Sequence, residues 1–142
     1  MTAELTFVDT NVLLYAHDRS AGSKRDVAAA LVADLWTSRL GVLSTQVLQE
    51  FYVNATRKLP RPLSAPRARA IISNYATWPV RRVEPVDVVA ASRLEKRHHL
   101  PFWDALVIVC AARVGALRLV SEDMQHGRVI AGVRIENPFV AC

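Results

Sequence analysis

Short runs of apolar and β-branched residues alternate along the chain with longer stretches whose apolar residues recur at helical spacing. The short runs lie at 5–8, 41–44, 80–83, 117–120 and 133–135. The stretches between them predict helices over roughly 23–39, 45–58, 67–77, 86–97 and 102–112. Because alternating strands and helices favour parallel pairing, the pattern predicts an α/β domain around a mainly parallel sheet.

Three prolines interrupt this pattern between two of the predicted helices. Pro60, Pro62 and Pro66 lie within KLPRPLSAPR at 58–67. Proline lacks a backbone donor and pushes the residue before it out of helical geometry. We therefore expect an extended connector over this segment.

The composition is that of one compact globular domain. The chain has 142 residues, of which 51% are hydrophobic and 22% charged, which excludes a disordered chain or a collagen-like repeat. Its two cysteines, Cys110 and Cys142, give no disulfide framework and favour a reducing compartment. We expect one domain over 1–142.

No segment predicts export or membrane insertion. The N-terminus has neither the basic nor the apolar part of a signal peptide. Asp104 and Arg113 interrupt the longest apolar stretch, 100–117, and charges are costly at a bilayer centre. We therefore expect a cytoplasmic protein.

Basic residues outnumber acidic ones. Eighteen Lys and Arg against thirteen Asp and Glu give a formal charge of +5, which favours a phosphate-rich or acidic partner. Two concentrations of basic residues either follow RNA phosphates or form a solvated surface: Arg57, Lys58, Arg61, Arg67 and Arg69, and Arg81, Arg82, Arg93, Lys96 and Arg97.

Two acidic residues follow predicted strands. Asp9 comes directly after the first short run, and Asp123 lies just past the fourth. Ligands of open parallel sheets bind beyond the carboxyl ends of the strands, so both positions predict a site. The structural alternatives are that Asp9 caps a helix beginning near Thr10 or Asn11, and that Asp123 stabilises a turn.

Two further acids belong to predicted helices. Asp104 lies in a helix whose other residues from 102 to 112 are apolar, and a buried carboxylate needs partners. Glu50 lies at the margin of an apolar stripe, in a helix that Ser44 is expected to cap. The alternatives are that the helix dipole stabilises Asp104, because Pro101 opens its helix, and that Glu50 is simply solvated.

Together the four acids predict one pocket, provided that the strands ending at 9 and 121 are neighbours. Two like charges 4 Å apart repel by about 4 kcal/mol at an effective dielectric of 20, so such carboxylates bind protons or divalent cations. Oxygen ligands favour Mg²⁺ or Mn²⁺, and no His or Cys set here has zinc spacing. On a basic protein this combination predicts hydrolysis of phosphodiesters by metal-activated water.

Four segments, in order, resemble the PIN-domain nucleases, and within that family the VapC-type toxins of bacterial toxin–antitoxin pairs. They are FVDTNVLLYAHD at 7–18, LSTQVLQEFY at 43–52, FWDALVIVCAARVGA at 102–116 and LVSEDMQHG at 119–127, and each holds one of the four acids. The resemblance implies a three-layer α/β/α domain with a short central sheet. It also implies a single-strand-directed, metal-dependent endoribonuclease whose partners are RNA, a cognate antitoxin and a second copy of the chain.

The resemblance further implies roles for individual residues. The catalytic acids that bind Mg²⁺ or Mn²⁺ become Asp9, Glu50, Asp104 and Asp123. The supporting polar groups become Thr10, Asn11 and Ser44.

The fourth segment departs from some relatives, which carry a further acid where this chain has Gln125 and His126. Glu122 could substitute, but adjacent side chains on an extended segment point opposite ways, so we expect Asp123 to be the ligand. His126 is a candidate substrate contact because it lies close to Asp123 in sequence.

Two alternatives stay open. One is a structure-specific DNA nuclease or RNA-processing nuclease of the same fold, and the other is a catalytically silent PIN-like interaction domain.

The spacing of Trp36, Trp78 and Trp103 is typical of packing residues and not of a base-stacking platform.

Overall fold

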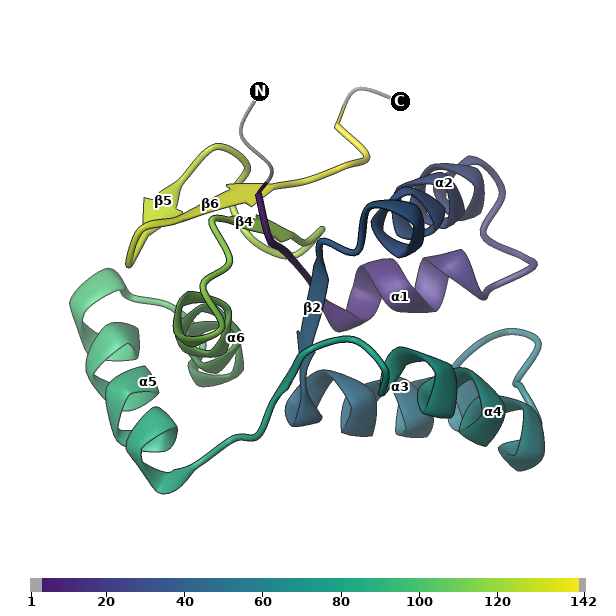
Figure 1. Cartoon of the computed structure of the whole chain (residues 1–142), viewed down its shortest axis with the longest axis horizontal. Helices are drawn as coiled ribbons and strands as arrows, with labels where there is room; N and C mark the ends of the chain where they lie inside the picture. Colours follow the sequence, from purple (N-terminus) through teal and green to yellow (C-terminus); the bar gives the residue numbers. More distant parts are fainter. Residues whose placement is uncertain (1–3, 141–142) are drawn as a thin grey trace.

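The computed structural model describes residues 4–140, which form a six-stranded sheet in the order β3-β2-β1-β4-β6-β5 (Figure 1). The strands are β1 (Thr6–Val8), β2 (Gly41–Ser44), β3 (Val80–Arg81), β4 (Arg118–Val120), β5 (Val129–Ile130) and β6 (Val133–Glu136). Neighbouring strands run parallel except β5, which runs antiparallel to β6. The predicted mainly parallel sheet is confirmed.

Helices cover both faces of this sheet. The helices are α1 (Thr10–Ala16), α2 (Ser23–Ser38), α3 (Thr45–Arg57), α4 (Ala65–Tyr75), α5 (Pro85–His98) and α6 (Phe102–Arg113). Figure 1 shows α5 and α6 on one side of the strands and α1 to α4 on the other, which is the expected α/β/α arrangement. Between residues 4 and 140, no helix combines the length and the apolar character needed to cross a membrane.

The central strands are buried on both faces. Phe7 of β1 pairs with Val42 of β2 on one side and with Leu119 of β4 on the other, and all three side chains are fully buried. Strands enclosed in this way consist of continuous apolar runs and not of alternating ones. Because β1 and β4 are parallel neighbours, the residues after their carboxyl ends, Asp9 and Ser121, meet at one edge of the sheet.

The helix α6 is the apolar centre of its layer. Its residues 105–111 are all buried, and it packs against β2, β4 and β6. A helix that is apolar all round must be enclosed on all sides, and α5 covers the side away from the sheet. This packing fixes the first turn of α6, which carries Asp104, beside the carboxyl ends of the strands.

The proline-rich connector is shorter than predicted. The helix α4 begins at Ala65, so Pro66 lies within its first turn, where proline is tolerated because the N–H it lacks has no helical partner. Ser64 caps this helix by accepting a hydrogen bond of 3.2 Å from the Arg67 backbone N–H. The hairpin strand β5 was not predicted, and it pairs over two residues only.

An aromatic cluster packs against the amino end of β2. Trp78 is 8% exposed, and its ring lies so close to Gly41 that a Cβ atom there would be 2.4 Å from its Cζ3 atom. Trp36 contacts Trp78 edge-on, with 5.0 Å between ring centroids. The packing role predicted from the sequence is confirmed for Trp78. Trp36 packs against Trp78 on one side but is 39% exposed, so the prediction holds only in part for Trp36. Cys110 is a buried free thiol, and Cys142 lies outside the described residues.

Candidate active site

The first acid is both a helix cap and a buried carboxylate. Asp9 lies between β1 and α1 and accepts a hydrogen bond of 2.7 Å from the Thr10 backbone N–H to its Oδ1. Its Oδ2 accepts a second bond of 2.7 Å from the Ser121 hydroxyl. The capping role predicted as the structural alternative is therefore present, and it leaves the carboxylate at the sheet edge, 6% exposed.

The surroundings of Asp9 disfavour its charge. Burial is the largest cause, and it raises the pKa of this carboxyl from 3.8 to about 6 even though the bonds from Ser121 and Thr10 lower it. The negative charges of Glu50 and Asp123 raise the pKa further. A buried carboxylate near two others is a group that a cation would stabilise.

The second acid comes from α3. Ser44 is fully buried and caps this helix, its Oγ accepting a bond of 3.4 Å from the Val47 N–H, as predicted. The cap fixes the start of the helix, so Glu50 lies one and a half turns later at the edge of the core. The Thr10 hydroxyl donates a hydrogen bond of 3.2 Å to Glu50 Oε1. Ser44 thus supports the site through the backbone, while Thr10 contacts one of its acids.

The third acid lies in the first turn of α6. Asp104 is half-buried, and burial raises its pKa above the ordinary value, with added contributions from the charges of Asp123 and Glu50. The helix dipole favours a negative charge at this position. Asp104 is therefore both an acid of the site and a residue stabilised by the dipole of its helix, the two interpretations that the sequence offered.

The fourth acid is held by an amide from α1. Asn11 donates from Nδ2 to Asp123 Oδ2 over 3.0 Å, and its Oδ1 accepts a bond of 3.1 Å from the Glu122 N–H. The Glu122 side chain turns away and bonds the Tyr15 hydroxyl at 2.7 Å and the Lys24 ammonium. The structure therefore places Asp123 in the site and Glu122 outside it, as expected.

The four acids line a single pocket of about 150 Å³. They come from the ends of β1 and β4 and from α3 and α6, and the other lining residues are Thr10, Asn11, Leu14, Gln46, Asn54, Trp103 and Val107. We call this hollow the acidic pocket. Its donors are carboxylate, amide and hydroxyl oxygens, which is the chemistry that Mg²⁺ and Mn²⁺ prefer.

The spacing of the acids limits how an ion would be held. Within residues 4–140, no three His, Cys, Asp or Glu side chains are grouped closely enough to hold one metal ion. Mg²⁺ commonly binds through one or two carboxylates and keeps several waters, so the donor set fits this ion without a cage of direct ligands.

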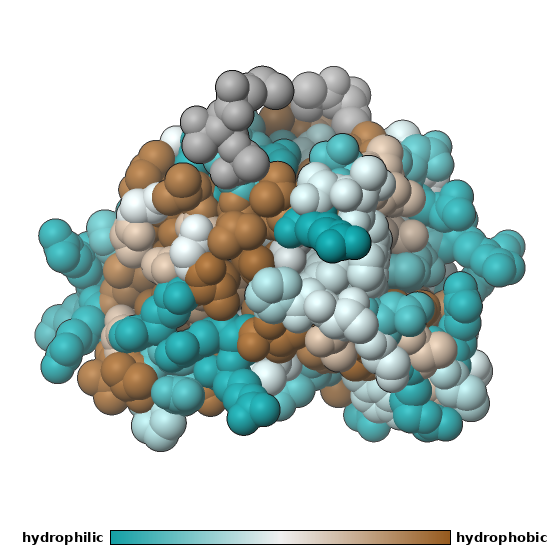
Figure 2. All heavy atoms as spheres, in the orientation of Figure 1, coloured by the Kyte–Doolittle hydropathy of each residue, from teal (hydrophilic) through white to brown (hydrophobic). Residues whose placement is uncertain are grey.

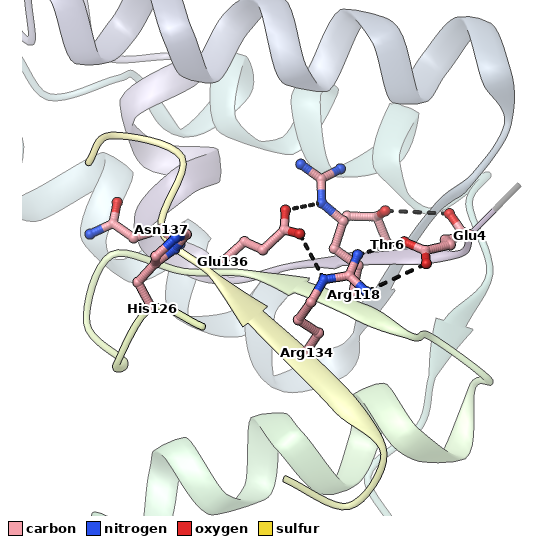
Figure 3. A network of polar contacts seen from close by, with 7 residues as sticks. All are labelled: Glu4, Thr6, Arg118, His126, Arg134, Glu136 and Asn137. Carbon is pink, nitrogen blue, oxygen red and sulfur yellow. Dashed lines mark hydrogen bonds and ion pairs between the residues drawn. The ribbon is translucent and has the colours of Figure 1, made fainter. Parts of the chain in front are cut away.

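His126 lies outside the acidic pocket. Its Nδ1 accepts a bond of 3.0 Å from the Asn137 N–H, and Figure 3 shows the two residues side by side beyond the end of β6. The same figure shows Glu136 between Arg118 and Arg134, which ties β4 to β6. The structure does not bring the predicted substrate contact at His126 to the acids.

The prediction that Trp103 is a packing residue is wrong. Its side chain is 62% exposed and lines the acidic pocket next to Asp104. The tryptophan spacing in the sequence carries no information on this orientation.

Sequence reasoning also missed Gln46 and Ser121. Gln46 is 4% exposed, donates from Nε2 to the Trp103 carbonyl over 3.4 Å, and has an Oε1 without a hydrogen-bond partner among the described residues. Ser121 is fully buried and contacts Asp9. A signal for Ser121 existed, because it is a polar residue at the carboxyl end of an apolar strand.

The chain is similar in sequence to a known family of proteins. The sequence model described as the PIN domain matches residues 6–131. No curated protein matches the chain.

Several solved structures share the fold at low sequence identity. A toxin–antitoxin complex from Klebsiella pneumoniae is 16% identical with a TM-score of 0.70, covering 94% of this chain and 98% of its own. VapC20 of Mycobacterium tuberculosis, a sarcin-ricin loop cleaving toxin, is 19% identical with a TM-score of 0.61, covering 80% and 86%. VapBC2 from Rickettsia felis, bound to a DNA fragment from its promoter, is 14% identical with a TM-score of 0.64, covering 93% and 97%.

Proposed function

Because the chain belongs to the PIN domain family, we propose that it is a metal-dependent endoribonuclease and the toxin of a toxin–antitoxin pair. The observation that carries the proposal is the convergence of Asp9, Glu50, Asp104 and Asp123 on one pocket of a protein with net charge +5. Acidic side chains meet in such a pocket at an electrostatic penalty, which a divalent cation removes.

The residues we propose to hold Mg²⁺ or Mn²⁺ are the four acids of the pocket, Asp9, Glu50, Asp104 and Asp123. Because no three of them are grouped closely enough to ligate one ion together, each ion would be bound through one or two of these carboxylates directly and would keep several waters. The ion, when bound, supplies Lewis-acid activation of the phosphodiester and of an attacking water. Around it the chain positions its own groups: Ser121 and the Thr10 N–H orient Asp9, and Asn11 holds Asp123. Glu50 accepts a hydrogen bond from the Thr10 hydroxyl, and as a carboxylate it could also orient or deprotonate a water.

RNA is the substrate we propose, and an antitoxin and a second copy are the proposed partners. Support for the antitoxin comes from two of the related structures, the toxin–antitoxin complex from Klebsiella pneumoniae and the DNA-bound VapBC2 from Rickettsia felis. Support for RNA comes from the basic charge and from VapC20, which is a sarcin-ricin loop cleaving toxin. An adjacent gene for a small DNA-binding protein that co-purifies with this chain would support the antitoxin.

The second copy is proposed to bind on the side of α5 and α6. Figure 2 shows hydrophobic residues gathered over this half of the molecule. Three valines of α5 are 43–51% exposed: Val86, Val88 and Val89. Exposed apolar side chains that lie next to one another mark interaction surfaces, whereas single ones do not. Burial of these side chains against another copy would stabilise a dimer, which sedimentation analysis of the purified chain would detect.

Incubation of the purified chain with total cellular RNA tests the activity. We expect new 5′ ends with Mg²⁺ or Mn²⁺ and none with EDTA. Asp104→Asn should abolish cleavage, whereas Asp34→Asn, an exposed acid on α2, should not change it. Cleavage of DNA alone would favour the alternative of a DNA nuclease, and the absence of any cleavage would favour a silent interaction domain.

A further inference from the structure

Two cavities outside the acidic pocket lie at the opposite end of α1. One has a volume of about 420 Å³ and the other about 410 Å³, and they share the lining residues His17, Arg67 and Ile71. Figure 1 shows α1 between α2 and α4, and both helices contribute to the walls. We call the two cavities together the arginine groove.

The positive charge of the arginine groove is not balanced by acidic residues in its lining. Four arginines line it: Arg19, Arg25, Arg61 and Arg67. No acidic residue lines either cavity. Within residues 4–140 the side chains of Arg19, Arg61 and Arg67 form no ion pair, and Arg25 approaches only the exposed Asp26, at 3.8 Å. Several guanidinium groups around one hollow attract an anion with more than one charged oxygen.

The half-buried His17 lies within the positive electrostatic potential of these arginines. Burial lowers the pKa of this imidazole below 6.5, and the charges of Arg67 and Arg25 lower it further. Its Nε2 lies 2.9 Å from the Tyr75 hydroxyl, so the ring is fixed in place. The charge of the groove is therefore carried by the arginines and not by the histidine.

The wall of the groove next to the arginines is aromatic. Trp36 is 39% exposed, and its ring centroid lies 5.6 Å from that of Tyr75. Ile71 and Thr77 complete this wall. Positive charge beside a partly exposed aromatic ring is a combination that binds single-stranded nucleic acid, because phosphates contact the cations while an unpaired base stacks.

We infer that the arginine groove binds an unpaired segment of the RNA substrate, with phosphates on Arg19, Arg61 and Arg67 and a base against Trp36. The inference rests on the proposed function, since that function supplies RNA as the ligand. The acidic pocket and the arginine groove lie at opposite ends of α1, because Asp9 caps one end of this helix and His17 the other. Seven helical residues span about 10 Å, so one strand reaches both places. These contacts lie away from the cleaved bond and position the RNA strand relative to the acidic pocket.

Binding of a fluorescein-labelled oligouridylate, followed by fluorescence anisotropy with EDTA present, tests this site without cleavage. The variant Arg61→Gln/Arg67→Gln should bind at least tenfold more weakly at low salt. Its dependence of log affinity on log salt should be less steep by about 1.4, because each phosphate contact to a single strand contributes about 0.7. The matched control Arg93→Gln/Arg97→Gln removes the same charge from exposed positions of α5 and should retain the slope.

A second probe tests the base contact. An abasic oligomer of the same length should bind the unmodified chain about fivefold more weakly or worse, since a stacked base is lost. Trp36→Leu should reduce this difference while the salt dependence is retained. If Trp36→Leu does not fold, the abasic comparison on the unmodified chain still decides whether a base contributes.

Three results would overturn the inference. Equal losses in the two double-arginine variants would mean that only net charge matters. Equal affinity for a perfect RNA duplex would exclude an unpaired base. Binding of an oligoglutamate peptide, lost in Arg61→Gln/Arg67→Gln while RNA binding persists, would assign the groove to an acidic protein. Failure of the proposed function has a different signature, namely no cleavage with Mg²⁺ or Mn²⁺ while the arginine-dependent RNA binding is observed.

Discussion

The Ser121 hydroxyl lies 2.7 Å from Asp9 Oδ2, and this bond joins the ends of β4 and β1 at the centre of the acidic pocket. Both residues are buried. The same oxygen of Ser121 accepts a bond of 3.3 Å from the Asp123 N–H, so one hydroxyl orients two of the four acidic segments.

Loss of this hydroxyl should weaken the metal site. We expect Ser121→Ala to lower both Mn²⁺ affinity and the rate of RNA cleavage by 10- to 100-fold, the usual effect of removing a group that orients a metal ligand. Isothermal titration and a cleavage assay measure the two quantities. Thr37→Ala removes a hydroxyl that bonds the Ala33 carbonyl on α2, a helix that contributes no residue to the acidic pocket, and should change neither. Unchanged Mn²⁺ affinity in Ser121→Ala would contradict the orienting role.

Removal of the buried charge at Asp9 should stabilise the metal-free protein. The unfolded chain releases this proton near pH 3.8 and the folded chain near pH 6, so the folded state is destabilised above pH 6 and not below 3.8. At about 1.4 kcal/mol per pH unit, the difference is about 3 kcal/mol. Asparagine retains the helix cap.

Urea unfolding in EDTA measures this effect. Asp9→Asn should have a higher free energy of unfolding at neutral pH, and the gain should shrink as the pH falls from 7 to 4. Asp34→Asn provides the exposed control. A gain that does not depend on pH would show that the charge of Asp9 is not its source.

Gly41 should tolerate no side chain. A Cβ atom there would lie 2.4–2.7 Å from three ring atoms of Trp78, which is well inside van der Waals contact. Because Trp78 packs against Trp36 and Tyr75, its ring cannot move away freely. We expect Gly41→Ala to lower the free energy of unfolding by about 2 kcal/mol or more. Thermal unfolding with circular dichroism checks this, and a midpoint equal to that of the unmodified chain would contradict it.

The alternating pattern was sufficient to predict most of the fold. The run at 41–44 and the helix that follows it are found where expected, because the apolar run must be buried and Ser44 is a good cap. The start of α4 was predicted two residues too late. A proline is common both in a loop and in the first turn of a helix, so the sequence around Pro66 does not distinguish the two. The strand β5 was not predicted, because a strand of two residues is too short to give an alternating pattern.

Two of the acids could be predicted because they occupy positions where packing alone would favour another residue type, whereas Glu50 and Asp123 also suit an ordinary surface or turn and were assigned together with the other two. Asp9 follows a strand, and Asp104 interrupts an apolar helix. The exposure of Trp103 could not be predicted, since a tryptophan next to an apolar run is usually buried. The arginine groove could not be predicted either, because Arg19 and Arg67 are distant in sequence and only the fold brings the loop after α1 and the first turn of α4 to the same cavity.

The central claim is that the acidic pocket holds a divalent cation, and direct Mn²⁺ binding tests it. Metal-free protein is titrated with Mn²⁺ above pH 6, and free Mn²⁺ is measured by its paramagnetic resonance signal. We predict saturable binding to the unmodified chain and to Asp34→Asn, and binding at least tenfold weaker to Asp104→Asn. No saturable binding to the unmodified chain, or equal binding to Asp104→Asn, would contradict the account.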